Sequence, residues 1–560
     1  MSEILINIFS IFSFIIIFLF SYLGYGIFFL NKIFKSNLEV DLGQIGLLGI
    51  FLLINISYLS NFVIPHNYFH NIIILMVGLI LFFINFKKFK MQDIKLIFLL
   101  ILLTITFFFI SKNHDDFPYY HLPLALHLFE NKITIGSGLL NYGFRHHSSI
   151  LFLNSLTFLP HIKYYLFNLP NYLILVFVNF ILLKEIFKNY HSKSFILYLS
   201  LIFISIINIK FTRLSEYGTD LAGQILLIVI FLNFFKNISN RDNINLIYFN
   251  AILLLITFSL KAYFILYFLL IPLTFYILKI NPFSKKNFNN RLFIFTIIFF
   301  VLFFLQNFLS TGCLIYPVTL TCFGDNYFWS LNISEVERMN TWLELWAKAG
   351  ATPNFQVENA ENYIKGIDWI YQWLDIYFFN KVLDFILILI FINIIFYFLF
   401  KNEIHIDIKT KKLLNKFITP FLFLIIVFWF FKHPSLRYGG YFPISILIVL
   451  FAVNLYKKSK IKNGLNKNYL LKIKGILLIT IIIFNLKNIV RINYEFGRED
   501  QYKFTNFPLF FVKEKKYKSL KLDNKQYLNI TEGYCWATPT PCSNTEIKAR
   551  IINDYLFFEK

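Results

Sequence analysis

Long apolar runs follow one another along most of the 560 residues, and they restrict the fold to one class. A helix crosses roughly 30 Å of hydrocarbon with about 20 residues. Inside a bilayer the backbone must satisfy its own hydrogen bonds, so such runs form helices. We mark the runs at residues 4–30, 43–63, 68–86, 94–110, 164–186, 194–209, 219–235, 244–260, 262–279, 291–309, 380–400, 416–431, 440–456 and 474–490. The sequence therefore predicts an all-α polytopic membrane protein with about 14 transmembrane helices.

The composition and charge agree with a bilayer as the main partner. A hydrophobic content of 57% and a mean hydropathy of +0.62 exclude a soluble globular protein of this length. The net charge of +22 is explained by short basic loops that face anionic lipid. We therefore expect no nucleic-acid partner.

Clusters of Lys and Arg orient the predicted helices, because short basic loops stay in the cytoplasm. The clusters are Lys87, Lys88 and Lys90; Lys285, Lys286 and Arg291; Lys409, Lys411 and Lys412; and Lys457, Lys458, Lys460 and Lys462. Alternation from these loops places both termini outside. The first apolar run is long and has no basic residues before it, so we expect no cleavable signal peptide.

This orientation divides the chain into six parts. They are N-terminal transmembrane helices (1–110), an outward acidic loop with juxtamembrane helices (111–163), a transmembrane core (164–309), a second outward loop (310–379), C-terminal transmembrane helices (380–490) and a small extracytoplasmic tail lobe (491–560). Residues 148–160 are apolar but must not cross the bilayer if the basic loops share one face. We expect them to lie on the outer leaflet or to dip into it.

All four cysteines fall on the outward side, as two close pairs. Cys313 and Cys322 lie in the second outward loop, and Cys535 and Cys542 lie in the tail. Disulfides persist outside the cytoplasm, so both pairs are disulfide candidates. The alternative is four unpaired thiols in loops. Neither pair has the CxxC spacing of a typical metal site.

Two pairs of tryptophans in the second outward loop have helical spacing. Trp342 and Trp346 are four residues apart, as are Trp369 and Trp373, so each pair shares a helix face. We favour interfacial helices anchored in the headgroup layer. The alternative is a platform on which a sugar stacks.

The acidic pair Asp115 and Asp116 directly follows an apolar run and is the first candidate for chemistry. Carboxylates are costly beside a bilayer, and a positioned carboxylate can act as a general base. Arg and Lys can hold a phosphate. Further ionisable or polar residues at outward helix ends are His121, Arg145, His146, His147, Arg213, Glu216, Lys261, Arg437 and Tyr438. Simpler alternatives stay open, with Arg213 and Glu216 paired as structure and Lys261 snorkelling to the interface.

Two short elements carry a family resemblance. The run Asp115-Asp116-Phe-Pro-Tyr-Tyr-His121 and the run Leu436-Arg437-Tyr438-Gly-Gly-Tyr-Phe-Pro443 resemble elements of the GT-C superfamily of polyprenyl-phosphate-sugar glycosyltransferases, of the aminoarabinose-transferase and protein-mannosyltransferase type. The run from Cys535 to Cys542 is similar to one in an uncharacterised group of bacterial membrane proteins. Arg145-His146-His147-Ser148 departs from the superfamily pattern, because Pro-Pro-Leu is expected there. The number of helices before the acidic loop is also larger than is typical.

The resemblance implies a GT-C-like fold in the bacterial cytoplasmic (inner) membrane, with an extracytoplasmic active face. It implies inverting transfer of a sugar from a polyprenyl-phosphate donor to a lipid or glycan acceptor. Asp115 is the first choice for the base and Asp116 the second, and Mg²⁺ or Mn²⁺ at the pair is an option. The alternatives are a surface-polysaccharide polymerase that uses Arg145 and Arg437, a lipid-linked oligosaccharide flippase, and a structural membrane protein.

Overall fold

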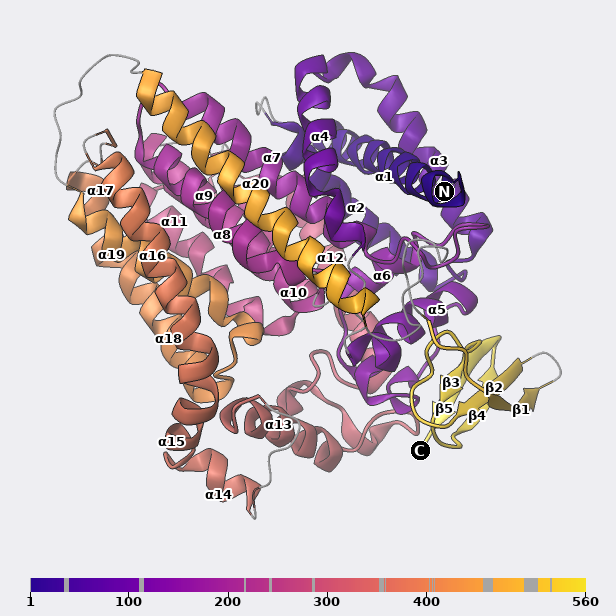
Figure 1. The fold of residues 1–560 in the computed structure, drawn as a ribbon. Helices are drawn as coiled ribbons and strands as arrows, with labels where there is room; N and C mark the ends of the chain where they lie inside the picture. Colours follow the sequence, from indigo (N-terminus) through magenta and orange to yellow (C-terminus); the bar gives the residue numbers. More distant parts are fainter. Residues whose placement is uncertain are drawn as a thin grey trace.

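The computed structural model is a bundle of long helices with a small β lobe at one end, which we call the lobe end (Figure 1). The structure describes residues 2–34, 40–109, 115–215, 218–240, 244–284, 288–351, 357, 359–401, 403–404, 406, 408–456, 467–497, 512–523 and 526–560. Glu216, His405 and the predicted basic-loop residues 285–286 and 457–462 lie outside these ranges.

Within the described ranges, 11 helices are long and apolar enough to cross a membrane, so the chain is a helical multi-pass membrane protein. They are α1 (Ser2–Phe29) with η1 (Leu30–Phe34), α2 (Leu42–Asn61), α4 (Met91–Thr104) with η3 (Ile105–Phe109), α7 (Leu169–Asn189), α8 (Phe195–Lys210) with η7 (Phe211–Arg213), α9 (Gly218–Asn240), α12 (Asn290–Thr311), α15 (Trp369–Trp373) with η11 (Leu374–Val382) and α16 (Leu383–Phe400), α17 (Ile408–Leu413) with η12 (Leu414–Ile418) and α18 (Thr419–Lys432), η13 (Leu436–Gly440) with α19 (Tyr441–Leu455), and α20 (Lys467–Phe496).

Three further apolar helices are shorter. They are α3 (Tyr68–Ile84), which leads into η2 (Phe86–Lys88), α10 (Ile244–Leu260), and η8 (Ala262–Leu269) continued by α11 (Leu270–Leu278). Each of the predicted apolar runs coincides with one of the long or short helices. The count of 14 transmembrane helices stays a prediction, because these three are below the length of the others.

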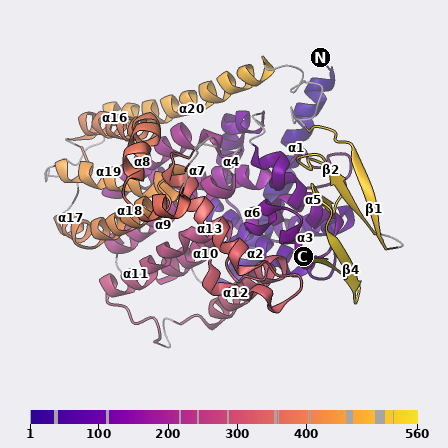
Figure 2. The same ribbon diagram turned by 90° about the horizontal axis from the view of Figure 1, so that it is seen from below.

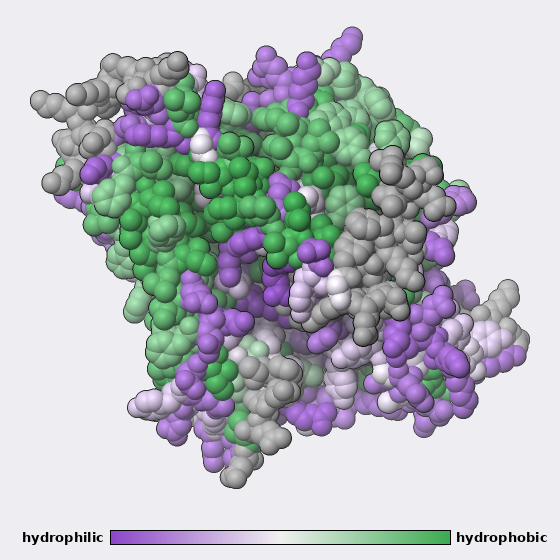
Figure 3. All heavy atoms as spheres, viewed as in Figure 1, coloured by the Kyte–Doolittle hydropathy of each residue, from purple (hydrophilic) through white to green (hydrophobic). Residues whose placement is uncertain are grey.

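The helices divide into buried and lipid-like surfaces. Helices α7, α8 and α9 are mainly apolar and are buried along most of their length, as expected for the centre of a large bundle. Helices α16, α18 and α20 instead expose large apolar side chains, such as Phe391, Phe423 and Leu478. The face in Figure 3 accordingly carries a broad apolar surface, bordered by hydrophilic residues at both ends.

Two stretches outside the long helices cover the lobe end. Residues 115–168 contain η4 (Phe117–His121), α5 (Leu122–Glu130), η5 (Ser137–Leu139), η6 (Tyr142–Arg145) and α6 (Ser149–Ser155), and residues 312–368 contain η9 (Thr319–Thr321), η10 (Gly324–Asn326), α13 (Ile333–Lys348) and α14 (Ala360–Lys365). The expectation of a leaflet helix at 148–160 is wrong. Helix α6 has only seven residues, all of them buried, and it packs against α2, α5, α7 and α10.

The C-terminal lobe consists of β-strands, which an all-α expectation does not cover (Figures 1 and 2). A three-stranded sheet has the order β1 (Tyr517–Asp523), β2 (Gln526–Thr531) and β3 (Cys542–Ser543), and a hairpin pairs β4 (Lys548–Ile552) with β5 (Tyr555–Glu559). Strand β5 buries alternate residues, Leu556 and Phe558, against the rest of the protein. This period of two is the sequence pattern of a half-buried strand.

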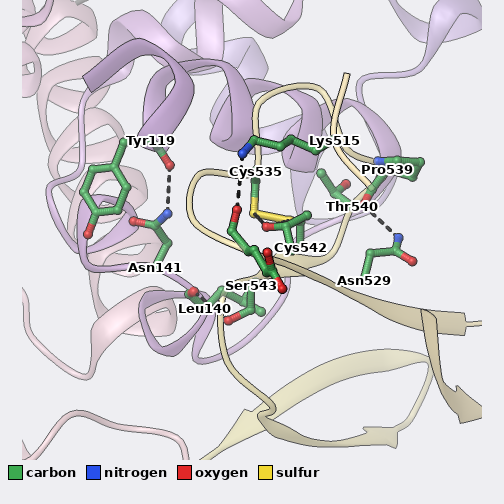
Figure 4. Close-up of a disulfide and its surroundings, with 12 residues drawn as sticks. Tyr119, Leu140, Asn141, Lys515, Asn529, Cys535, Pro539, Thr540, Cys542 and Ser543 are labelled. Carbon is green, nitrogen blue, oxygen red and sulfur yellow. Dashed lines mark hydrogen bonds between the residues drawn. A yellow bond between two sulfur atoms is a disulfide. The ribbon is translucent and has the colours of Figure 1, made fainter. Parts of the chain in front are cut away.

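Backbone and side-chain hydrogen bonds join the lobe to the described part of the acidic loop (residues 115–163). The Ile135 amide donates to the Leu556 carbonyl oxygen at 2.9 Å, and the Phe558 amide donates to the Ile135 carbonyl oxygen at 2.9 Å. The Ser543 hydroxyl donates to the Leu140 carbonyl oxygen at 3.1 Å (Figure 4). The β lobe therefore belongs to the same packed unit as the residues around the acidic pair.

The structure contains two disulfides. Cys313 is bonded to Cys322 just after α12, and Cys535 is bonded to Cys542 in the lobe (Figure 4). No free cysteine occurs in the chain. These are the two pairs that the spacing of the cysteines singled out.

Candidate active site

The two aspartates of the acidic pair have different surroundings. Asp115 is exposed, and within the described chain its carboxylate forms no ion pair. Asp116 starts the short η4 turn, where Pro118 fixes the backbone direction. Its Oδ2 atom lies 2.5 Å from Nη2 of Arg437, which is more than 300 residues further along the chain. The geometry therefore favours Asp116 over the first choice made from the sequence.

Arg437 lies in a break between helices α18 and α19. Tyr438 and Gly439 depart from helical geometry, and Gly439 has a φ of +89°, which L side chains rarely adopt. The carbonyl oxygen of Arg437 accepts hydrogen bonds from Nε2 of Gln224 at 3.1 Å and from the hydroxyl of Tyr263 at 3.3 Å. The backbone at Arg437 is thus fixed from two neighbouring helices.

A third acidic residue, Asp220, completes the arrangement and was missed in the sequence analysis. It lies fully buried in the first turn of α9, where one carboxylate oxygen pairs with Nε of Arg437. The other oxygen lies 3.5 Å from Nζ of Lys261. A carboxylate at a helix N-terminus is also favoured by the helix dipole. A single Asp at the start of an apolar helix was the available signal.

Four charges therefore alternate in one chain of contacts, from Asp116 to Arg437 to Asp220 to Lys261. They come from the residue before η4, from η13, from the start of α9 and from the residue before η8. Two carboxylates and two cations balance, which is what charges removed from water require. We call these four residues the charge chain. It joins segments that are far apart in the sequence, and three of its members, Asp116, Lys261 and Arg437, are among the site residues named from the sequence.

The side chains of Asp116 and Asp220 differ in access. The Asp116 side chain is 24% exposed and that of Arg437 is 21% exposed, whereas the Asp220 side chain is 0% exposed. A substrate hydroxyl can reach Asp116 but not Asp220. Asp220 can therefore act only by positioning Arg437 and Lys261.

Neutral histidines and tyrosines border the charge chain. Burial lowers the pKa of His121 to about 4 and that of His146 to about 3, so both imidazoles are neutral at pH 7. The Nε2 atom of His121 is buried and has no hydrogen-bond partner within the described residues. Burial also raises the pKa of the Tyr120 phenol, which stays protonated. These groups can donate or accept a hydrogen bond without adding charge.

Aromatic rings from α13, η13 and η8 lie beside the charge chain. The ring centroids of Trp346 and Tyr438 are 5.4 Å apart, and those of Tyr263 and Tyr438 are 6.3 Å apart. Trp346 belongs to α13 and is only partly buried. The second Trp pair differs, because Trp369 and Trp373 are buried in the protein. The sequence expectation of lipid-anchoring tryptophans is therefore wrong for Trp369 and Trp373.

Other predicted site residues have partners of their own. Nη1 of Arg145 lies 2.9 Å from a Glu335 oxygen, and its Nε donates to the Gly138 carbonyl oxygen. Nε2 of His147 lies 2.9 Å from the Tyr58 hydroxyl, and burial lowers the pKa of His147 to about 3. These contacts tie the 138–147 segment to its neighbours. Arg213 lies at the end of η7, and Glu216 lies outside the described residues.

The acidic pair does not form the donor set of a divalent cation. Asp115 is exposed while Asp116 pairs with Arg437, so the adjacent carboxylates do not converge. Between Asp116 and Asp220, the guanidinium of Arg437 occupies the position that a bridging ion would need. Among the described residues no group of three or more His, Cys, Asp or Glu could hold a metal. The residues present do not fit Mg²⁺ or Mn²⁺.

One family model, described as "Domain of unknown function (DUF8201)", matches residues 8–444. The chain belongs to this family. The part matched by the DUF8201 model contains all four residues of the charge chain and ends before the β lobe. No curated protein and no solved structure matches the chain.

Proposed function

We propose that this protein is a membrane glycosyltransferase of the GT-C type. In this proposal it moves a sugar from a polyprenyl-phosphate donor to a lipid or polysaccharide acceptor on the extracytoplasmic face of the bacterial inner membrane. The observation that carries the proposal is the partly exposed Asp116 carboxylate beside Arg437 and Lys261, at the lobe end of a membrane bundle. A base beside cations suits attack by a hydroxyl with loss of a phosphate.

The reaction would be a single displacement with inversion. An acceptor hydroxyl gives its proton to the Asp116 carboxylate while its oxygen bonds to the anomeric carbon. The bond from that carbon to the phosphate oxygen breaks, and the lipid phosphate leaves with the electron pair. Arg437 and Lys261 supply positive charge for the leaving group, and Asp220 keeps both in place.

A further feature supports a carbohydrate substrate. The partly exposed Trp346 lies against Tyr438, and an aromatic face can pack on the apolar face of a sugar ring.

Neighbouring aspartates provide a matched test. We expect Asp116→Asn to lower kcat/KM for sugar transfer about 100-fold or more, because a positioned base contributes about 10²–10⁴-fold. Asp115→Asn should keep most activity, because Asp115 is exposed and outside the charge chain. The measurement is transfer of radiolabelled sugar from polyprenyl phosphate in membranes that contain each variant.

The same assay separates the rival functions. A polymerase that depends on arginines should lose activity in Arg437→Lys and keep most of it in Asp116→Asn. A flippase should move lipid-linked oligosaccharide in vesicles without any new glycosidic bond. Either result would replace the glycosyltransferase proposal.

A further inference from the structure

The loop that follows α12 is closed by the disulfide between Cys313 and Cys322, and we call it the 313–322 loop. Residues 292–324 contain no Asp, Glu, Lys, Arg or His, so the uncharged stretch of α12 continues through this loop. Charge returns at Asp325, whose Oδ1 atom lies 2.5 Å from Nζ of Lys560, the residue after β5. The uncharged segment thus extends beyond a membrane-spanning helix and ends at a charged contact with the β lobe.

The 313–322 loop has both buried and exposed apolar residues. Cys313 and Tyr316 belong to a small apolar cluster with Val336 of α13. By contrast, Val318 is 46% exposed and Leu320 is 97% exposed. Apolar side chains grouped on an exposed surface mark contact with a membrane or with another protein. One part of the loop is therefore packed on the protein, and another part lacks a cover.

The exposed apolar residues continue a face of α12, a helix at the edge of the bundle (Figure 2). Val301, Leu305 and Phe308 follow one another at spacings of four and three residues, so they share one face of this helix. Val301 and Leu305 are exposed, as expected for side chains that face lipid. The ring of Phe323 lies against that of Phe308, with the ring centroids 5.2 Å apart, and Phe323 is itself exposed. The lipid-facing surface of α12 therefore extends to the end of the 313–322 loop.

The end of α12 has the aromatic residues of a membrane boundary. The ring centroids of Tyr327 and Trp329 are 5.4 Å apart, and they lie 5.6 Å and 5.2 Å from that of Phe308. Tyr and Trp are enriched where hydrocarbon meets headgroups. The Leu309 carbonyl oxygen accepts the amide hydrogen of Gly136 at 2.8 Å, so this end of α12 is the lobe end. The loop therefore lies at the height of the headgroups on that side.

The loop also satisfies much of its own backbone hydrogen bonding, which a segment in contact with lipid requires. The amides that donate within the loop or to the carbonyl oxygen of Gly312 are those of Leu314, Ile315, Val318, Thr321, Cys322 and Phe323. The Thr321 hydroxyl in turn donates to the Ile315 carbonyl oxygen at 3.0 Å. Contact with lipid would thus leave these amides with their partners.

We propose that the 313–322 loop contacts the membrane and inserts Val318 and Leu320 into the leaflet at the lobe end. The partner is lipid rather than another protein, because the loop is uncharged and continues the lipid-facing surface of α12. Removing these apolar side chains from water favours insertion. The chain runs from this loop into α13, which carries Trp346 beside Tyr438, so insertion would fix the depth of α13 at the leaflet. The inference does not depend on the chemistry at Asp116.

A spin label measures the surroundings of Leu320 in the full-length protein. The natural cysteines are all bonded in disulfides, so Leu320→Cys provides a single site for a nitroxide when no reductant is used. In phosphatidylcholine nanodiscs, the accessibility of the label to oxygen, which dissolves in lipid, is compared with its accessibility to a water-soluble nickel chelate. Val301→Cys is the lipid reference, and Lys365→Cys in the exposed part of α14 is the water reference. We expect Leu320→Cys to give the high oxygen-to-nickel ratio of Val301→Cys.

Other results of the same measurement would overturn the proposal. A ratio like that of Lys365→Cys means that the loop faces water. Low accessibility to both reagents means that protein covers Leu320. Dipolar broadening between two labels would then identify the cover as a second copy of the chain.

A charged variant tests the contribution of the leucine. With the label moved to Val318→Cys, Leu320→Asp should lower the inserted fraction of the loop about tenfold or more, because the leucine no longer drives insertion and a carboxylate opposes it. Asn326→Asp is the matched control, since it adds the same charge at an exposed position beyond the loop and should leave the ratio unchanged. An unchanged ratio in Leu320→Asp overturns the proposal. The labels on the otherwise unmodified chain decide the question even if the charged variant fails to fold.

Discussion

At the scale of single residues, the aspartates Asp115, Asp116 and Asp220 differ in their surroundings. Asp115 faces solvent, Asp116 is reachable from outside, and Asp220 is buried between two cations. Removing one partner of a buried ion pair leaves the other charge uncompensated. The three carboxylates should therefore differ in what they contribute to stability.

We predict that Asp220→Asn lowers the free energy of unfolding by about 3–5 kcal/mol, the usual cost of breaking a buried pair. Asp220 neutralises both Arg437 and Lys261, and it has no access to water. Asp115→Asn serves as the control and should change little. Thermal unfolding in detergent measures the difference, and equal stability of the two variants would contradict a structural role for Asp220.

The buried histidines predict a fall in stability at acid pH. Burial lowers the pKa of His121 and of His127 to about 4, below the ordinary value of about 6.5. Between pH 6.5 and 4 the unfolded chain binds protons that the folded protein does not, so unfolding becomes easier as the pH falls through this window. His121→Gln should flatten the dependence of the melting temperature on pH, whereas the exposed His191→Gln should leave it unchanged.

At the scale of elements, the break between α18 and α19 is what presents Arg437. Gly440 lies against the ring of Trp429, where an added Cβ would come within 2.6 Å, and the Trp429 indole donates to the Ser435 carbonyl oxygen at 2.8 Å. The Tyr377 hydroxyl accepts the amide hydrogen of Leu436 at 2.9 Å. The turn is thus held by the side chains of Trp429 and Tyr377 as well as by its own backbone hydrogen bond from the Tyr438 amide to the Ser435 carbonyl oxygen.

We expect Gly439→Ala to reduce activity more than it reduces stability. An L residue at a φ of +89° costs about 1–2 kcal/mol, and relief of that strain would rotate the Arg437 carbonyl away from Gln224. The matched control is Gly475→Ala in α20, where nothing lies within 4 Å of the added Cβ. The idea fails if Gly439→Ala keeps normal kcat/KM in the transfer assay.

The apolar helices could be predicted because hydropathy is a local property. Asp116, Lys261 and Arg437 could be named as candidates because ionisable residues at the ends of apolar helices are costly without a role. Asp220 could not, because one carboxylate in the first turn of a helix is also what ordinary helix capping produces. The burial of α6 and of Trp369 depends on long-range packing. The strands of the lobe are too short to be recognised from the sequence of a polar tail.

At the scale of the whole molecule, the β lobe forms hydrogen bonds with the acidic loop at η4 and at the end of α5. The Trp536 amide donates to the Pro118 carbonyl oxygen at 3.1 Å, two residues from Asp116. The Thr540 hydroxyl donates to a Glu130 oxygen at 2.7 Å. Both residues lie in the loop that the Cys535–Cys542 disulfide closes.

We predict that removing this disulfide weakens the contact between the β lobe and the acidic loop. The double substitution Cys535→Ser and Cys542→Ser removes a bond of a kind that typically contributes about 2–4 kcal/mol, so the loop should become sensitive to protease while helix content stays normal. Sugar transfer should fall, because η4 loses its support. Limited proteolysis and circular dichroism measure the two effects. A loop that resists protease as well as before would show that the lobe is held by its other contacts.

The contact between Glu130 and Thr540 spans 410 positions of the chain. A nascent polypeptide with every long helix already inserted would still lack the lobe that contacts the acidic loop. Under the proposed function, sugar transfer at Asp116 would therefore begin only after translation has passed the last strand.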